Sequence, residues 1–248
     1  MAIDRGIEPV SEHAGVPNLW RLTGMAGIAC VVLTWGQFPL WMTGDPPSVY
    51  DGAAFTRHLS SIKNVVFTRI LFDLGIYVSL MVFGAGFRHL VRQARTECEW
   101  VGTLVFGAGA VWAGVTLVAD GLEGGAALDA LSGSANPSGV RALVEGTILI
   151  YNGSIAFAIT GLFLGAAGYA TFSSGVLPRW TGWVAYTGAA LCAMCIPAMY
   201  GGAVASSGYN AGAVGPAIIA NFPPLIWLLI VGILLVRNGR RLQTREQP

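Results

Sequence analysis

The chain has 248 residues, of which 54% are hydrophobic and only 11% are charged, and its mean hydropathy is +0.62. A soluble domain of this length needs a larger charged fraction to cover its surface. The composition therefore excludes an ordinary soluble protein and predicts an integral membrane protein, whose first partner is the lipid bilayer.

Long apolar windows predict the fold. A bilayer core about 30 Å thick requires roughly 20 apolar residues per helix. These windows predict an all-α protein with six transmembrane helices in one bundle over 19–236, between an N-terminal tail (1–18) and a basic C-terminal tail (237–248). The windows are 19–42, 64–88, 98–120, 143–170, 178–201 and 214–236.

Basic residues indicate the orientation of these helices. If the N-terminus is cytoplasmic, ten Arg lie in cytoplasmic segments and only four basic residues lie in the external half. Cytoplasmic loops carry the excess of Lys and Arg, so both termini are predicted to be cytoplasmic. Thirteen Arg against one Lys also suggests a bacterial genome, which predicts a multi-pass protein of the bacterial plasma membrane, the cell inner membrane. The external four are Arg57, Lys63, Arg69 and Arg141.

The first window ends in polar and helix-breaking residues. Gln37 lies roughly 8 Å below the external end of this helix, at 1.5 Å per residue, and Pro39 removes a backbone donor two residues later. The connection at 43–63 is predicted to be external, with a short amphipathic helix after its prolines.

The second window carries two opposite charges. Arg69 and Asp73 lie roughly 6 and 12 Å from the external end, and their spacing of four residues places them on one helix face. The cytoplasmic halves of the windows hold no ionisable residue at such depth. A charge facing lipid costs about 2.5–3.5 kcal/mol, so both side chains are expected to point inward.

The third and fourth windows bring further polar residues to the same level. Asp120 ends the third window, a Gly-rich external connection is expected over 121–142, and Glu145 and Asn152 share a face of the fourth. We expect Arg69 to bridge Asp73 and Glu145, and Asn152 to donate to Asp73.

The last two windows hold cysteines and prolines. Cys192 and Cys195 have the spacing of a redox motif, but thiolates are disfavoured in an apolar helix; packing is the favoured interpretation, and a metal pair with Cys30 the alternative. Pro197 is expected to break the fifth helix. In the sixth, Asn221 lies roughly 10 Å deep, and the diproline at 223–224 frees carbonyls that protein or water must satisfy.

These polar side chains form a layer in the external half, which we call the polar layer, with two interpretations. It is either a structural ion pair with water-filled kinks, or a site for a ligand, an ion or a proton. No histidine lies in a span core and no nucleotide-binding or protease motif is present, so no catalytic residue, metal site or cofactor is predicted. The candidate ligand-binding residues are Arg69, Asp73, Glu145, Asn152, Asn221, Gln37 and Asp120.

Two stretches resemble a known family. One is Arg69-Ile70-Leu71-Phe72-Asp73-Leu74; the other joins Gly168-Tyr169 to the turn at 174–182, Ser-Gly-Val-Leu-Pro-Arg-Trp-Thr-Gly. Both are similar to the bacterial membrane proteins of domain of unknown function 4386. The resemblance implies six spans and supports the Arg69–Asp73 position, and it implies no activity.

The function predicted from this pattern is a binding or accessory membrane protein with a polar pocket in the external half. In it, Arg69 holds an anionic group or the pocket itself, and Asp73 is the buried acid. One alternative is a small-solute or proton-coupled transporter, which would need polar residues in the apolar cytoplasmic halves. The others are an intramembrane enzyme acting on lipid or quinone and a structural partner of another membrane protein. A small ligand, a lipid or a membrane protein is the expected partner, and no nucleic acid is.

Overall fold

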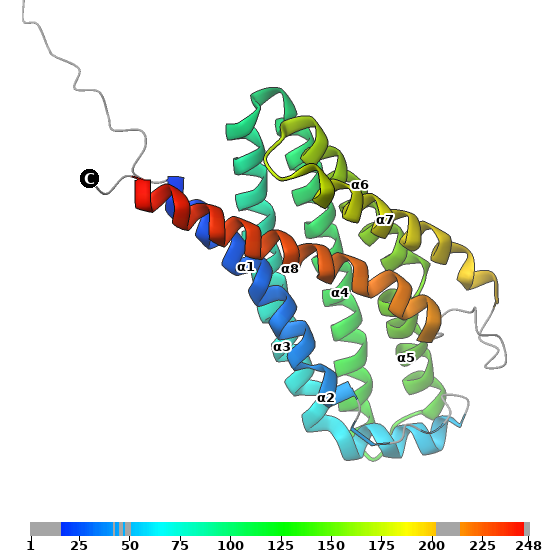
Figure 1. Ribbon diagram of the computed structural model, residues 1–248. Coiled ribbons are helices and arrows are strands. Elements are labelled where there is room, and N and C mark those ends of the chain that lie inside the picture. The colour runs from blue at the N-terminus through cyan, green and yellow to red at the C-terminus, as the bar shows by residue number, and fades with distance from the viewer. Residues whose placement is uncertain (1–15, 42, 45–46, 48–50, 202–213, 246–248) are drawn as a thin grey trace, which may run out of the picture.

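The computed structural model describes residues 16–41, 43–44, 47, 51–201 and 214–245. These residues contain helices and no strand, which confirms the all-α prediction (Figure 1). The predicted N-terminal tail as far as residue 15, and the connection at 202–213 between the fifth and sixth predicted windows, lie outside the described residues. The elements are α1 (Val16–Gly36), α2 (Phe38–Trp41), α3 (Gly52–Ala94), η1 (Thr96–Cys98), α4 (Glu99–Leu131), α5 (Pro137–Asn152), α6 (Ser154–Ser174), α7 (Arg179–Cys195), η2 (Ile196–Gly201) and α8 (Val214–Arg245).

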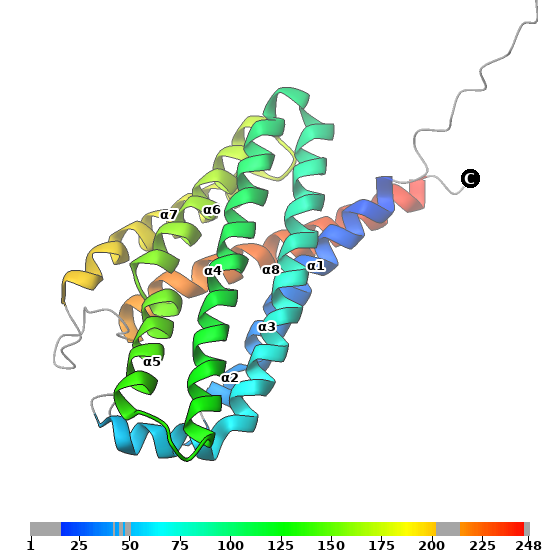
Figure 2. The same ribbon diagram turned by 180° about the vertical axis from the view of Figure 1, so that it is seen from behind.

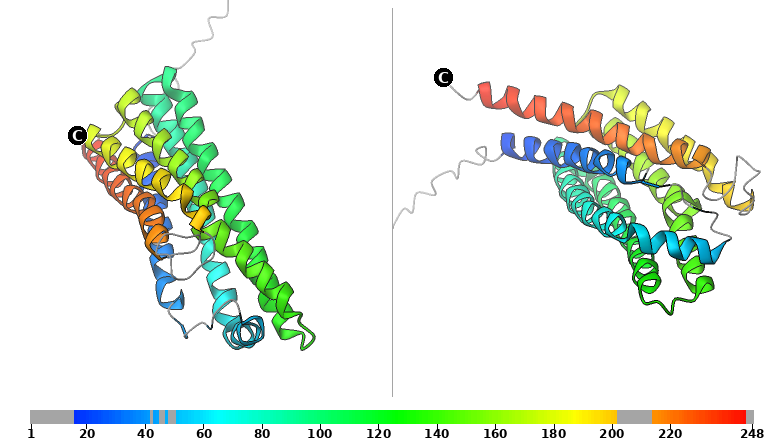
Figure 3. Two further views of the ribbon diagram at one scale, coloured as in Figure 1. Left: turned by 90° about the vertical axis from the view of Figure 1, so that its right-hand side faces the viewer. Right: turned by 90° about the horizontal axis from the view of Figure 1, so that it is seen from below.

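Six segments of the described chain are long and apolar enough to cross a membrane, as predicted. The pair α3–α4 runs the height of the molecule, and the start of α1 and the end of α8 lie side by side (Figures 1 and 2). Figure 3 shows α1 and α8 on one side of the α3–α4 pair. We call the end with α2 and the α4–α5 turn the α2 end. The spans are Asn18–Leu40, Gly52–Ala94, Thr96–Leu131, Pro137–Ser174, Arg179–Gly201 and Gly215–Gly239.

Two helices are longer than predicted. α3 begins at Gly52, where Asp51 caps it by accepting a bond from the Ala54 N–H at 3.0 Å, so the short amphipathic helix is continuous with the second span. α4 continues to Leu131. The interpretation of 121–142 as one long loop is therefore wrong, because alanine and leucine in this stretch sustain a helix despite its glycines.

The fourth span is two helices, α5 and α6, which the sequence analysis did not predict. The break lies at Gly153, whose backbone is extended (φ −116°, ψ −175°). A Cβ at this position would collide with the backbone of Leu149. Glycine therefore permits a turn that ends α5 and restarts the chain as α6 in a new direction.

Small residues bring pairs of helices into close contact. α1 and α8 cross where an ideal Cβ on Gly24 would lie 2.5 Å from the carbonyl oxygen of Gly232. Gly168 of α6 meets Tyr186 of α7 in the same way, since a Cβ on Gly168 would lie 2.8 Å from the tyrosine ring. Gly107 and Gly114 of α4, in contrast, face open space.

The prolines act differently on the two helices that contain them. α7 ends at Cys195 and a 3-10 turn follows through Pro197. α8, in contrast, continues through Pro223 and Pro224 without interruption. The carbonyl that Pro224 frees is that of Ala220, four residues earlier, and it accepts a bond from the Cys192 thiol at 3.4 Å. A side chain thus replaces the missing backbone donor.

Candidate functional site

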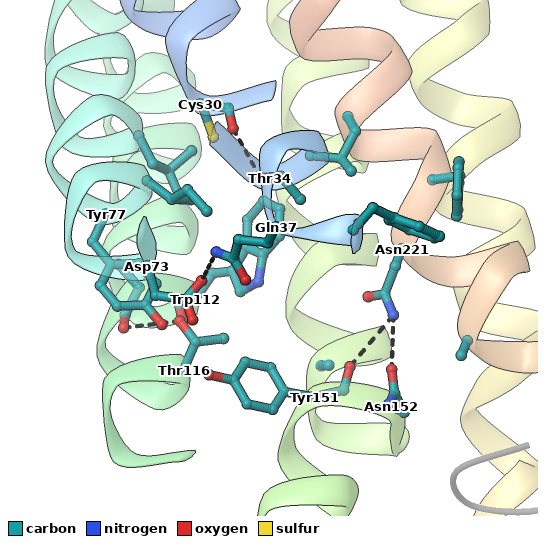
Figure 4. Close-up of a pocket in the computed structure, with 18 of the residues that line it drawn as sticks. Cys30, Thr34, Gln37, Asp73, Tyr77, Trp112, Thr116, Tyr151, Asn152 and Asn221 are labelled. Atoms are coloured by element: carbon teal, nitrogen blue, oxygen red, sulfur yellow. Dashed lines mark hydrogen bonds between the residues drawn. The ribbon is translucent and has the colours of Figure 1, made fainter. Parts of the chain in front are cut away.

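A cavity of about 410 Å³ lies among α1–α6 and α8 (Figure 4). Its wall includes part of the predicted polar layer. Asp73, Gln37, Asn152 and Asn221 are on its wall. Four predicted residues from four segments of the chain are therefore brought together at one cavity.

Asp73 meets Gln37 rather than the partners expected for it. The Gln37 Nε2 atom donates to Asp73 Oδ1 at 2.6 Å, and Figure 4 shows this bond at the cavity wall. Gln37 occupies the break between α1 and α2 and is 3% exposed. The break between α1 and α2 thus places the amide of Gln37 against the carboxyl group of Asp73 on α3.

Asp120 is a buried acceptor behind the cavity wall, not a surface cap. It accepts bonds from the Tyr77 hydroxyl at 2.7 Å and from the Tyr151 hydroxyl, and it also contacts the Asp73 carboxyl group. Arg69, Asp73 and Tyr77 are spaced by four residues along one face of α3, so this face meets α4 with all three side chains.

Arg69 forms an ion pair that was not predicted. Its Nη2 atom lies 2.8 Å from Oε2 of Glu123, and both side chains are nearly buried, at 6% and 12% exposure. The prediction that Arg69 bridges Asp73 and Glu145 is therefore wrong, because Arg69 pairs with Glu123. Arg69 is also absent from the cavity wall, so its predicted role in holding an anionic ligand has no geometric support.

Glu145 lies away from the cavity. It pairs with Arg141 of its own helix, Nε to Oε1 at 2.8 Å, and both side chains are solvent- or lipid-accessible at 39% and 44%. The physical reason is the length of α4, which carries Glu123 to the level of Arg69 and leaves no place there for Glu145.

Asn152 and Asn221 pair with each other. Asn221 Nδ2 donates to Asn152 Oδ1 at 3.1 Å and reaches the Tyr151 carbonyl oxygen at 3.5 Å. The predicted bond from Asn152 to Asp73 is not formed. The Gly153 break explains this, because Tyr151 and Asn152 sit at the free C-terminal end of α5, where carbonyls lack helical donors.

Aromatic side chains form much of the remaining wall, and sequence reasoning missed them. They are Phe38, Tyr77, Trp112, Tyr151 and Phe222. Phe38 and Phe222 meet edge to face at 6.3 Å between ring centroids. The available signal was spacing, because Tyr77 follows Asp73 by one turn of α3 and Tyr151 adjoins Asn152.

No metal site is formed by the described residues, among which no group of three His, Cys, Asp or Glu is close enough to hold an ion. The four cysteines are buried as free thiols. Cys192 accepts a bond from Thr160 and donates to the Ala220 carbonyl, which agrees with the packing interpretation.

The arrangement is chemically suited to binding. The wall combines apolar and aromatic surface with one carboxyl group and three amides, a composition typical of small-molecule sites. The carboxyl groups of Asp73, Asp120 and Glu123 surround a single guanidinium, that of Arg69. Acidic groups therefore outnumber the basic group around this cavity.

Comparison with known proteins leaves the family open: no protein-family profile, no curated protein and no solved structure matches this chain. The resemblance to domain of unknown function 4386 stays a prediction.

Proposed function

We propose that this protein is a multi-pass membrane protein that binds a small organic molecule in the cavity beside Asp73. The cavity carries the proposal: its volume of about 410 Å³ and its mixed apolar and polar wall fall within the range of ligand sites, about 300–1,000 Å³. A site that only stabilised the fold would be filled by side chains, because protein interiors are close-packed.

The mouth of the cavity supports a ligand that arrives from the bilayer. Phe38 and Ile218 are the exposed residues among those that line it, at 45% and 50%. Both belong to segments apolar enough to lie in the membrane. We infer from these two residues that the cavity opens between α2 and α8, toward the side of the bundle.

The proposed orientation is that of a bacterial plasma-membrane protein with both termini in the cytoplasm. The excess of arginine at the end of the bundle away from α2 supports it. In this orientation the cavity lies in the outer half of the membrane.

A block of aromatic side chains favours a binding protein over an open channel. Phe83, Phe87 and Phe163 surround Trp227 with ring centroids 5.8–5.9 Å away, and all four are fully buried. They begin one turn beyond Leu80, which lines the cavity. These side chains close the cavity toward the end of the bundle away from α2, which is cytoplasmic in the proposed orientation. A receptor or accessory protein requires such a closed end.

Native mass spectrometry of the purified protein tests the proposal, with two variants that add side-chain volume at adjacent positions of α4. Ala113 lines the cavity, whereas an ideal Cβ on Gly114 meets nothing within 4 Å. Ala113→Leu should fill part of the cavity, while Gly114→Leu should extend into lipid.

We expect a stoichiometric extra mass on the wild type and on Gly114→Leu, and its loss from Ala113→Leu. Metal analysis of the same samples identifies an inorganic ligand. A clean protein mass for all three proteins, after gentle extraction with native lipid present, would contradict the proposal and favour the structural interpretation of the polar layer.

A further inference from the structure

We infer that the ligand of this cavity is a small organic cation, bound with its ammonium group against Asp73 and the aromatic wall. This inference rests on the proposed function and adds the ligand's chemical class. Charge complementarity is the first argument for it: Asp73 is the only Asp, Glu, Lys, Arg or His among the described residues that line the cavity.

The positive charge nearest to Asp73 is directed elsewhere. The Arg69 guanidinium is bonded to Glu123 at 2.8 Å, one turn of α3 away from Asp73, and does not line the cavity. Asp73 accepts a bond from a neutral amide, that of Gln37, at 2.6 Å, and it also contacts the carboxyl group of Asp120. A carboxyl group held by a neutral donor in an apolar cavity favours a cation as its further partner.

The aromatic groups favour the same ligand class. Trp112, Tyr77 and Tyr151 lie around Asp73 in Figure 4 and come from three different helices. The face of an aromatic ring attracts an ammonium group, most strongly for Trp and most strongly where water is excluded. An anion would meet these negative ring faces and the carboxyl group together, so the wall disfavours it.

The opposite wall supplies acceptors for a ligand N–H group. Asn221 uses its Nδ2 atom on Asn152 and on the Tyr151 carbonyl oxygen, and its amide oxygen is turned toward the cavity (Figure 4). The cavity thus presents a carboxyl group on one side and an amide oxygen on the other.

Three probes of one shape test the inference. Benzyltrimethylammonium, neopentylbenzene and benzylsulfonate share a benzyl group and a tetrahedral head of the same heavy-atom count, and carry positive, zero and negative charge. Binding to the detergent-purified full chain is measured through tryptophan fluorescence and calorimetry. Partition into detergent is the same for every variant, so the ratio of wild-type to variant affinity is compared for each probe.

The decisive variant is Asp73→Asn, which keeps the side-chain shape and removes the charge. We expect benzyltrimethylammonium to lose affinity by about tenfold or more, as a desolvated charge and ring contact would predict, and neopentylbenzene to be unaffected. Trp112→Leu should also weaken the cation more than the neutral probe. Glu145→Gln, which removes an acid outside the cavity, is the matched control and should change neither.

An affinity for neopentylbenzene or benzylsulfonate that equals the affinity for the cation, after each affinity is corrected for the measured partition of that probe into detergent, would overturn the inference. So would an Asp73→Asn ratio near one for all three probes. The wild-type ranking decides the matter even if a variant fails to fold. These outcomes are separate from a failure of the proposed function, which is shown by the absence of any ligand mass and by equal behaviour of Ala113→Leu and Gly114→Leu.

Discussion

The polar side chains along and behind the cavity wall contact one another. Arg69 meets Glu123, Gln37 meets Asp73, and two tyrosines meet Asp120. A buried charge is costly without a partner of opposite sign and a buried polar group is costly without a hydrogen bond, so these contacts stabilise the region behind the cavity wall. The groups that face the cavity are consequently held in place before any ligand enters.

Removal of Glu123 tests the ion pair. Glu123→Leu leaves the guanidinium of Arg69 in an apolar environment without its carboxylate, and should lower the free energy of unfolding by roughly 3–5 kcal/mol. The double variant Arg69→Leu/Glu123→Leu should recover most of this loss. Thermal unfolding in detergent measures both.

The exposed pair Arg141–Glu145 is the control. Glu145→Gln should change stability by less than about 1 kcal/mol, because an exposed pair is screened. If Glu123→Leu were as mild as Glu145→Gln, the buried pair would have no structural role.

The partner of Arg69 could have been found from the sequence. A tight turn makes α3 and α4 antiparallel, so residues at equal distance from it lie opposite each other. Arg69 lies 27 residues before Thr96, and Glu123 lies 27 residues after it. Because 121–142 was assigned to a loop, Glu123 was not considered as the partner of Arg69. Glu145 was predicted as the partner instead. The Gln37–Asp73 bond has no such signal, because it depends on how α1 crosses α3.

At the scale of the helix, a side chain replaces a backbone hydrogen bond that a proline removes from α8. The Cys192 thiol reaches the carbonyl of Ala220, which Pro224 leaves without its helical donor. Gly188 on the same helix provides room for Pro223, since a Cβ there would lie 2.8 Å from the proline ring. α7 is therefore shaped to fit the diproline of α8.

A double-mutant cycle measures this coupling. Pro224→Ala restores the N–H to the Ala220 carbonyl, so the thiol is no longer needed. Cys192→Ala should cost about 1 kcal/mol more in the native background than in Pro224→Ala, as measured by thermal unfolding. Equal costs in the two backgrounds would show that Cys192 acts by packing alone; Cys195→Ala, the same deletion one turn along the chain, should show no coupling to Pro224.

The contact between α1 and α8 gives a second prediction at this scale. Gly24→Leu places a side chain against the backbone of Gly232 and should lower stability by about 1–3 kcal/mol through overpacking. Gly107→Leu, at a position with nothing within 4 Å, should be neutral. Thermal stability of the two variants in parallel provides the measurement; a neutral Gly24→Leu would mean that the helices separate without cost.

Hydropathy predicted the number of spans but not where the helices begin and end. A span is recognised by its length and its apolar content, and both can be read from a window of the sequence. The limits of α4 and the division into α5 and α6 depend on local features: small residues that sustain a helix beyond the apolar window, and one glycine, Gly153, whose extended backbone redirects the chain.

At the scale of the whole molecule, the turns divide between two ends. η1, with the turn after Ala94, lies at one end, and the α4–α5 turn at 132–136 lies at the other (Figure 1). The charge distribution predicts that the first is cytoplasmic. The packing of the helices is the same in either orientation, whereas the distribution of Lys and Arg acts during insertion.

Single cysteines in these turns test the orientation. The four native cysteines are buried, so they leave a low background for a membrane-impermeant maleimide. Ser134→Cys should be labelled in intact cells, and Thr96→Cys only after lysis; both positions are exposed. The reverse pattern would invert the topology and place the cavity in the cytoplasmic half of the membrane.

If the proposed ligand enters from the bilayer between Phe38 and Ile218, its concentration must be counted in the membrane rather than in water. An amphiphilic ligand accumulates in the bilayer first and then meets the protein by diffusing within two dimensions. Occupancy is then governed by the mole fraction of ligand in the lipid, and the same aqueous dose gives different occupancies as the amount of membrane varies. Affinities for this cavity will be comparable between preparations only when they are expressed per lipid.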